Sequence, residues 1–140
     1  MPTKRRTGPG RQDQSLHAGS PSQRRGRMAE DAALALLLAA GHRVIQRNFH
    51  CRLGEIDLIT LSRRQVLVFT EVRWRSREDY GGAAASIGPA KIRRLQATAE
   101  VFLCRHPVNR NRLMRFDVIT FGGCPPCWRP QWIKGAFDSR

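Results

Sequence analysis

The sequence predicts a single α/β domain in which a mixed β-sheet is flanked by helices, in the order α-β-β-β-α-β. The chain has 140 residues, which suffices for one hydrophobic core. Apolar residues recur at helical spacing over residues 28–41 and 89–105. The segments between and after these two are rich in β-branched and aromatic residues, which are typical of strands.

Residues 1–26 are predicted to form a disordered basic tail ahead of the folded domain, which is expected to span residues 27–140. The tail consists mostly of Gly, Pro, Ser, Gln and Arg, with almost no apolar side chains. Such a segment cannot bury enough surface to fold by itself. It either adds non-specific affinity for phosphate or is only a solvated leader.

The first helix is predicted to run from residue 28 to Gly41, since glycine suits the position just after a helix. Glu30 lies one turn before Leu34, so this acid is expected to point along the core-facing side. The predicted apolar stripe consists of Leu34, Leu37 and Leu38.

The second helix is predicted over residues 89–105, because Pro89 suits the first helical position and His106-Pro107 ends the helix. Its predicted core side consists of Ile92, Leu95, Ala99 and Phe102.

The strands are predicted at residues 42–51, 54–61, 66–75 and 112–121, and the tryptophan-containing C-terminal segment is expected to pack as a last short element. The second and third of these strands form a hairpin whose turn is expected at residues 62–65.

Three acids lie inside this apolar hairpin: Glu55, Asp57 and Glu71. A buried carboxylate is costly unless it is paired or bound to a metal. If Leu61 pairs with Leu67 across a five-residue loop, Asp57 faces Glu71; a four-residue loop would place the two acids on opposite faces. Facing carboxylates suit Mg²⁺ or Mn²⁺. Pairing of the acids with arginines is the alternative, and the spacing supports both equally.

The composition predicts a polyanionic partner. The formal net charge is +14, from 25 Lys and Arg against 11 Asp and Glu, and only three of the basic residues are Lys. Arginine binds phosphate bidentately, which favours nucleic acid over an anionic membrane surface. An arginine-rich genome would produce the same excess. No apolar run is long enough to span a bilayer.

The four cysteines do not form a small-disulfide pattern at this length, so we expect a reduced, cytoplasmic protein. Cys124 and Cys127 have the spacing of half a zinc ribbon, but the sequence lacks a second such pair. A turn at the two intervening prolines is the favoured interpretation.

Asp57, followed by Glu71-x-Arg73 on the next strand, resembles the signature of the PD-(D/E)XK nuclease superfamily. The chain more closely resembles the YraN family of uncharacterised bacterial proteins, which are similar in fold to Holliday junction resolvases. The matching segments cover about residues 26–137 and include "GEIDLI", "VFTEVRWRS" and "RFDVI". This resemblance implies a restriction-endonuclease-like domain.

The resemblance also implies roles for particular residues. The metal-binding acids fall on Asp57, Glu71 and the helix-borne Glu30, which would hold Mg²⁺ or Mn²⁺. Arg73 stands where the superfamily usually has Lys, and it could grip a phosphate but not act as a base. The implied catalytic residues are Asp57, Glu71, Arg73 and Glu30, and the implied substrate contacts are Arg73, Arg75 and Lys91. A solvated position at a helix start is the favoured interpretation of Lys91.

The leading expectation is a metal-dependent endonuclease that hydrolyses phosphodiester bonds in branched or structured DNA, acting as a homodimer. The alternative is a nucleic-acid-binding module with a weakened or inactive nuclease site, which the arginine at position 73 favours. A third expectation is a basic accessory protein that binds RNA or ribosomes, with its acids merely paired to arginines. No aromatic RNA-binding motif supports this third expectation.

Overall fold

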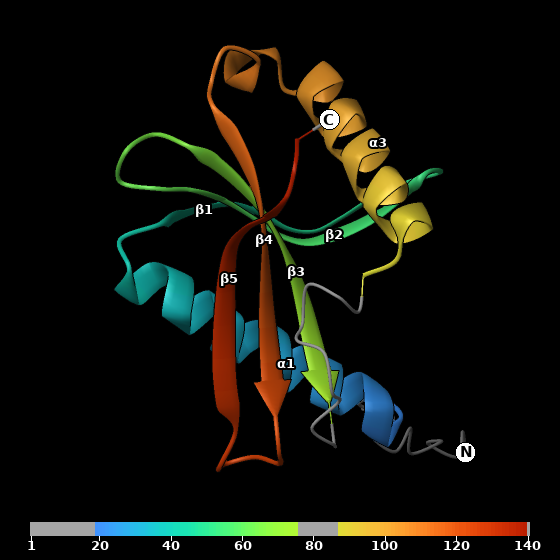
Figure 1. Cartoon of the computed structure of the whole chain (residues 1–140), viewed down its shortest axis with the longest axis vertical. Coiled ribbons are helices and arrows are strands. Elements are labelled where there is room, and N and C mark those ends of the chain that lie inside the picture. Colours follow the sequence, from blue (N-terminus) through green and yellow to red (C-terminus); the bar gives the residue numbers. More distant parts are fainter. Residues whose placement is uncertain (1–18, 76–86, 140) are drawn as a thin grey trace, which may run out of the picture.

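The computed structural model describes residues 19–75 and 87–139, with the Arg75 side chain excepted. It is an α/β domain with a five-stranded sheet and two helices (Figure 1). The predicted fold class is confirmed, with one more strand than predicted. The elements are α1 (Pro21–Ala39), β1 (Arg43–Cys51), β2 (Gly54–Leu61), β3 (Leu67–Arg75), α3 (Pro89–Arg105), a short 3₁₀ helix (Pro107–Asn109), β4 (Met114–Gly122) and β5 (Arg129–Phe137).

The sheet is mixed, with its strands in the spatial order β1-β2-β3-β4-β5. β3 and β4 are parallel, and every other neighbouring pair is antiparallel. Parallel neighbours need a long crossover connection, and here α3 lies within the segment that joins β3 to β4. The crossover places α3 beside β1 and β2.

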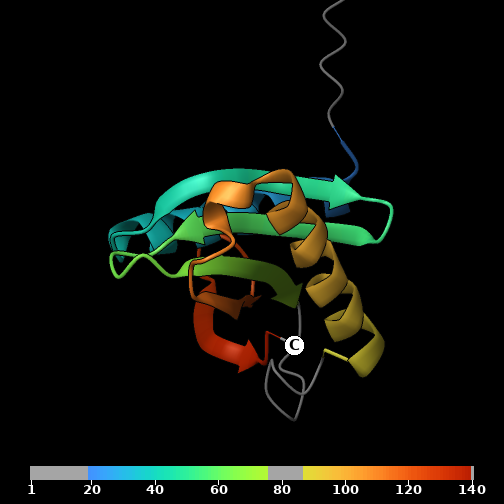
Figure 2. The ribbon, with the colours of Figure 1, turned by 90° about the horizontal axis from the view of Figure 1, so that it is seen from above.

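The two helices cover opposite faces of the sheet. The core beneath α3 contains Phe69 of β3 and Phe102 of the helix. The core beneath α1 contains Leu37 of the helix, with Val72 of β3 packed against it. Successive strand residues point to opposite faces, so Phe69 and Val72 assign one helix to each face. Figures 1 and 2 show the two helices at well-separated places around the sheet.

Helix α1 begins earlier than predicted. Its N-cap is Ser20, whose hydroxyl accepts a hydrogen bond from the Gln23 backbone, while the Gln23 side chain accepts one from the Ser20 backbone. This reciprocal capping box, with Pro21 at the first helical position, starts the helix. Residues 21–26, which were assigned to the predicted tail, are therefore helical. Residues 1–18 lie outside the described residues, and their predicted disorder stays a prediction.

The predicted end of α1 is confirmed, and its predicted core face is confirmed at Leu37 and Leu34 but wrong at Leu38. Gly41 has a φ of +87°, and its backbone N–H and that of His42 bond to the Leu38 and Leu37 carbonyls. This pattern is a Schellman motif, which favours glycine. The buried residues are Ala29, Ala33 and Leu37, whereas Leu38 is 50% exposed. The contact face is therefore formed by Ala29, Ala33 and Leu37, with Leu34 packed beside them.

The predicted hairpin register is confirmed. Leu61 pairs with Leu67, and the intervening turn has five residues. The turn is closed by hydrogen bonds from the Ser62 N–H to the Val66 carbonyl and from the Val66 N–H to the Ser62 hydroxyl. One step further, this register would set Asp57 of β2 against Glu71 of β3, but the backbone pairing of the two strands ends at Leu58 and Thr70.

The C-terminal element is a full strand rather than a short one. β5 pairs antiparallel with β4 over six residue pairs, with an irregularity near its end. The loop between β4 and β5 holds Cys124 and Cys127, both exposed and unpaired. Within the described ranges no helix is long and apolar enough to cross a membrane.

Candidate active site

Asp57 lies where β2 and β3 separate. The backbone pairing of β2 with β3 ends at Leu58 and Thr70, while β3 continues to pair with β4 as far as Arg75. Beyond that point the Asp57 carboxylate accepts a hydrogen bond of 2.8 Å from the Val72 N–H. A side chain thus takes the place of a ladder bond, which holds Asp57 in the opening between the strands.

The backbone around Asp57 is distorted. Arg47 pairs with Leu58 and Phe49 pairs with Ile56, which leaves Asn48 opposite Asp57 without a ladder pair. Asn48 has a φ of +50°, a left-handed conformation that asparagine tolerates better than most residues. Ile56 packs in the α3 core and Leu58 in the α1 core, although they are two residues apart. The break in alternation therefore falls on Asp57 and sets the direction of its side chain.

The Asp57 carboxyl lies close to other negatively charged side chains. Burial, together with the carboxylates of Glu71, Glu30 and Glu55, raises its pKa from 3.8 to about 7, against the opposing effect of a hydrogen bond from the Val72 backbone. An aspartate in such surroundings is costly to ionise without a cation. Strongly shifted pKa values of this kind occur mainly at functional sites.

Glu71 faces the α3 side of the sheet together with two cations. Its carboxylate lies 3.5 Å from the Lys91 ammonium and 3.8 Å from the Arg73 guanidinium. Burial raises the pKa of Glu71, while Lys91 and Arg73 lower it. Lys91 is the third residue of α3 and only partly exposed, so the favoured interpretation of a solvated position was wrong.

The other predicted residues are placed as follows. Glu30 is half-buried on α1, near enough for its charge to act on Asp57. Its neighbour Asp31 is exposed and pairs with Arg47 at 2.7 Å. Glu55 is exposed and lies 3.7 Å from His50. The Arg75 side chain and the alanine-rich loop of residues 76–86 lie outside the described residues.

The chemistry of these acids suits a metal ion, but their present spacing does not. Asp57, Glu71, Glu55 and Glu30 offer only carboxylate oxygens, which are the ligands that Mg²⁺ and Mn²⁺ prefer. Among the described residues, however, no group of three His, Cys, Asp or Glu side chains is close enough to hold an ion as it stands. Glu71 is engaged by Lys91 and Arg73 instead. Binding an ion would require the glutamates to turn toward Asp57.

A cavity of about 340 Å³ opens beside this cluster. It is lined by His50, Cys51, Gly54, Glu55, Lys91, Arg94 and Leu95. Arg94 follows Lys91 by one helical turn, and this spacing is the signal in the sequence that could have identified Arg94 as a cavity residue. The lining of the cavity therefore combines the Glu55 carboxylate with two cations of α3, Lys91 and Arg94.

Comparison with known proteins places the chain among proteins of similar sequence. Residues 29–121 match the model of the uncharacterised protein family UPF0102. A UPF0102 protein of Alcanivorax borkumensis is 49% identical over 118 residues, which cover 81% of this chain and 91% of that protein. Another from Alkalilimnicola ehrlichii is 46% identical over 122 residues, covering 87% and 93%. A third from Methylococcus capsulatus is 40% identical over 123 residues, covering 88% and 98%.

Proposed function

Because this chain belongs to the UPF0102 (YraN) family and sets a partly buried aspartate among three other acids, we propose that it is a metal-dependent nuclease that hydrolyses phosphodiester bonds in DNA. The observation that carries the proposal is the position of Asp57. Its carboxylate is held by one backbone N–H between two separating strands, and burial together with the neighbouring carboxylates raises its pKa to about 7. A site that concentrates negative charge in this way suits a cation.

We assign Asp57, Glu71 and Glu30 to Mg²⁺ or Mn²⁺ binding. When bound, such an ion lowers the pKa of a water ligand and neutralises charge on the phosphoryl group. Asp57 is fixed in place by the Val72 N–H, whereas Glu71 is held by side chains that can move. Glu55, at the edge of the adjoining cavity, either completes the set or orients a ligand.

Lys91, Arg73 and Arg94 are suited to hold the phosphate. Lys91 lies in the first turn of α3, where the helix dipole also favours an anion. Arg73 cannot act as a base, but its guanidinium stabilises negative charge on a phosphate oxygen. In this proposal Lys91 supplies the ammonium group that the superfamily usually carries at position 73. The cavity beside Glu55 is the place for the phosphodiester.

The substrate class is proposed from the family resemblance and the charge. The resolvase-like relatives implied by the resemblance act on branched DNA as homodimers. A formal charge of +14 favours a polyanion of this kind. We therefore propose branched or otherwise structured DNA as substrate, with two copies of the chain cutting two strands.

The test is a cleavage assay on four-way-junction, flap, single-stranded and duplex DNA, each with Mg²⁺, with Mn²⁺ and with chelator. Asp57→Asn should lower cleavage by roughly a hundredfold or more, because it removes a charge of the metal site while keeping the shape. DNA binding in chelator should be kept or become tighter. Asp31→Asn, an exposed acid of the same charge on α1, should behave like the wild type. Equal cleavage by wild type and Asp57→Asn would contradict the proposed site.

A second candidate function is a nucleic-acid-binding module whose nuclease site is inactive. The observation that favours it is the pairing of Glu71 with Arg73 and Lys91, which already neutralises one of the acids without a metal. Salt-sensitive DNA binding without cleavage of any substrate would support this function. If Arg73→Lys also failed to cleave, the nuclease proposal would be abandoned.

A further inference from the structure

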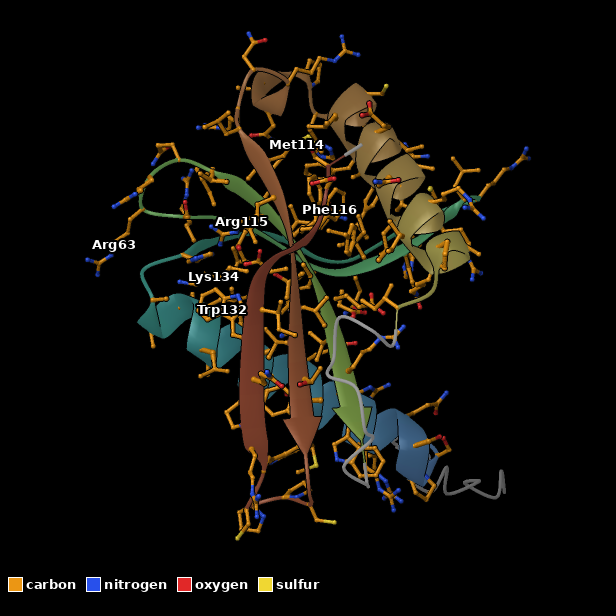
Figure 3. The ribbon with its side chains drawn as sticks, in the orientation of Figure 1. Arg63, Met114, Arg115, Phe116, Trp132 and Lys134 are labelled. Carbon is orange, nitrogen blue, oxygen red and sulfur yellow. The ribbon has the colours of Figure 1, made fainter. Side chains whose placement is uncertain are left out.

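A second cavity of about 340 Å³ lies at the turn end of the β2–β3 hairpin, and it shares no lining residue with the first cavity. We call it the basic pocket. It is lined by Ala40, His42, Ser62, Arg63, Arg64, Val66, Arg115 and Lys134. These residues come from the end of α1, the start of β1, the hairpin turn, β4 and β5. Figure 3 shows Arg63, Arg115, Lys134 and Trp132 gathered beside the hairpin turn and the last turn of α1.

The basic pocket has a strongly positive charge. Four of its lining residues are Arg or Lys, and its described lining contains no acid. Asp117, which lies behind Arg115, binds the guanidinium at 2.7 and 2.9 Å and offsets one of these charges. Burial lowers the pKa of His42, and Arg115 and Lys134 lower it further, against an opposing effect of Asp117. A lining with this excess of positive charge indicates a site that favours an anion.

The walls of the basic pocket are held in place before any ligand arrives. Arg115 is fixed by its bidentate pairing with Asp117. The Arg63 side chain lies against Gly41 so closely that a Cβ at this glycine would overlap it. Lys134 lies 4.7 Å above the Trp132 ring, which in turn meets the His42 ring edge to face. Preorganised cations bind an anion with less loss of side-chain freedom.

The same cations have a simpler explanation. The negative end of the α1 dipole lies at this pocket, since Ala40 and the carbonyls of the last turn are close by. Cations there would stabilise the helix by at most about 1 kcal/mol. That effect accounts for one cation at the helix end, but it does not account for Arg115 and Lys134 on strands β4 and β5. The excess of charge and the volume of the cavity point to a ligand.

We propose that the basic pocket binds a phosphate of the nucleic-acid backbone, as a contact separate from the acid cluster. The volume lies at the low end of the range of about 300 to 1,000 Å³ that is typical of small-molecule sites. It therefore has room for a phosphate together with part of its sugar. The Asp57 site is four residues along β2 from Leu61 at the turn, about 13 Å of extended strand. The basic pocket borders the end of α1, whereas the first cavity is lined by α3 on the other face of the sheet, so the two are separate contacts.

This proposal rests on the proposed function, because it takes nucleic acid as the ligand. The test is DNA binding by fluorescence anisotropy in chelator over a series of salt concentrations. The variant Arg63→Gln with Arg64→Gln should bind roughly tenfold more weakly and reduce the slope of log affinity against log salt by about 1 to 2. The matched control is Arg93→Gln with Arg110→Gln, two exposed arginines outside both cavities, which should keep the wild-type slope.

Three outcomes decide the matter. Equal loss of affinity and slope in both double variants would overturn the pocket, because binding would then follow overall charge. A wild-type thermal shift with a 5′-mononucleotide that disappears in the pocket variant, with DNA binding unchanged, would overturn the backbone phosphate as ligand. A pocket effect that persists while no DNA is cleaved with Mg²⁺ or Mn²⁺ would support the pocket and count against the nuclease. If the double variant fails to fold, Lys134→Gln, an exposed change in the same pocket, should show the same reduced slope by about 1.

Discussion

Asp117 and Asp57 are both largely buried aspartates in one sheet, yet their surroundings are opposite. Asp117 is 1% exposed, and every contact around it is a donor. Arg115 binds it with two N–H groups, and the Trp132 indole and the Gly135 backbone each donate one further hydrogen bond. Its charge and its lone pairs are satisfied by the protein itself.

Asp57 receives one backbone hydrogen bond and is otherwise surrounded by acids. Glu71, Glu30 and Glu55 all raise its pKa, in addition to the effect of burial. The difference shows how to separate a structural acid from a functional one. A buried carboxylate with full counter-charge joins parts of the fold, whereas one without counter-charge costs stability and indicates a ligand. The predictions below test this distinction.

The largest effect is expected at Asp117. Asp117→Asn keeps the shape but leaves the partly buried Arg115 without its counter-charge and three donor groups facing a neutral amide, which should reduce the free energy of unfolding by about 3 kcal/mol. Urea unfolding measures this loss. Asp31→Asn is the control, because the exposed pair of Asp31 with Arg47 should contribute only about 0 to 1 kcal/mol. Similar small losses in both variants would refute the structural role of Asp117.

Replacing Asp57 is expected to raise the free energy of unfolding, in contrast to replacing Asp117. Its pKa is raised from 3.8 to about 7 in the folded protein, so the folded state holds a proton that the unfolded state has lost. The contribution to stability is therefore complete below pH 4, falls as the pH rises and is gone above about pH 7. Asp57→Asn has no such charge and should be more stable than the wild type at pH 8, by on the order of 2 to 4 kcal/mol.

The two proteins should differ much less in acid. Urea unfolding at pH 5 and at pH 8 gives the difference directly. A variant that is less stable than the wild type at pH 8 would show that the Asp57 charge supports the fold and would place it with Asp117.

A divalent cation should stabilise the wild type by a smaller amount. Mg²⁺ or Mn²⁺ at about ten times its dissociation constant should add about 1.4 kcal/mol at pH 8, because it supplies the counter-charge that Asp57 lacks. Thermal unfolding detects the shift. Asp57→Asn should show little or none, and a monovalent salt at equal ionic strength is the control. An equal shift in both proteins would place the ion elsewhere.

The smallest effect on stability is expected from Arg73→Lys. Both residues keep a positive charge beside Glu71, so the free energy of unfolding should change by less than about 0.5 kcal/mol. If the protein is the proposed nuclease, cleavage should be preserved or raised, because the nuclease superfamily that the sequence resembles usually carries Lys at this position. Arg93→Lys, an exposed change on α3, is the control. A strong loss of cleavage in Arg73→Lys alone would show that the bidentate grip of arginine is needed.

The sequence alone determined most of the secondary structure, because local signals act over a few residues. Helix α3 has the predicted bounds, Pro89–Arg105, and Gly41 ends α1 as predicted. For Asp57 and Glu71 to share one face of the sheet, Leu61 had to pair with Leu67, and it does. The start of α1 was missed although Ser20 and Gln23 form a capping box, and β5 was judged too short, because an edge strand alternates only weakly in burial.

Tertiary structure alone decided how the acids meet their surroundings. The backbone is distorted at Asn48, and the Asp57 carboxylate enters the opening between β2 and β3, which strand parity does not predict. The crossover brings Lys91 to Glu71 across 19 intervening residues. The donors to Asp117 and the walls of the basic pocket likewise come from segments far apart in the chain. Periodicity fixes which face of an element a residue occupies, but distances between elements depend on how their cores pack. This packing surrounds Asp117 with donors and Asp57 with acids.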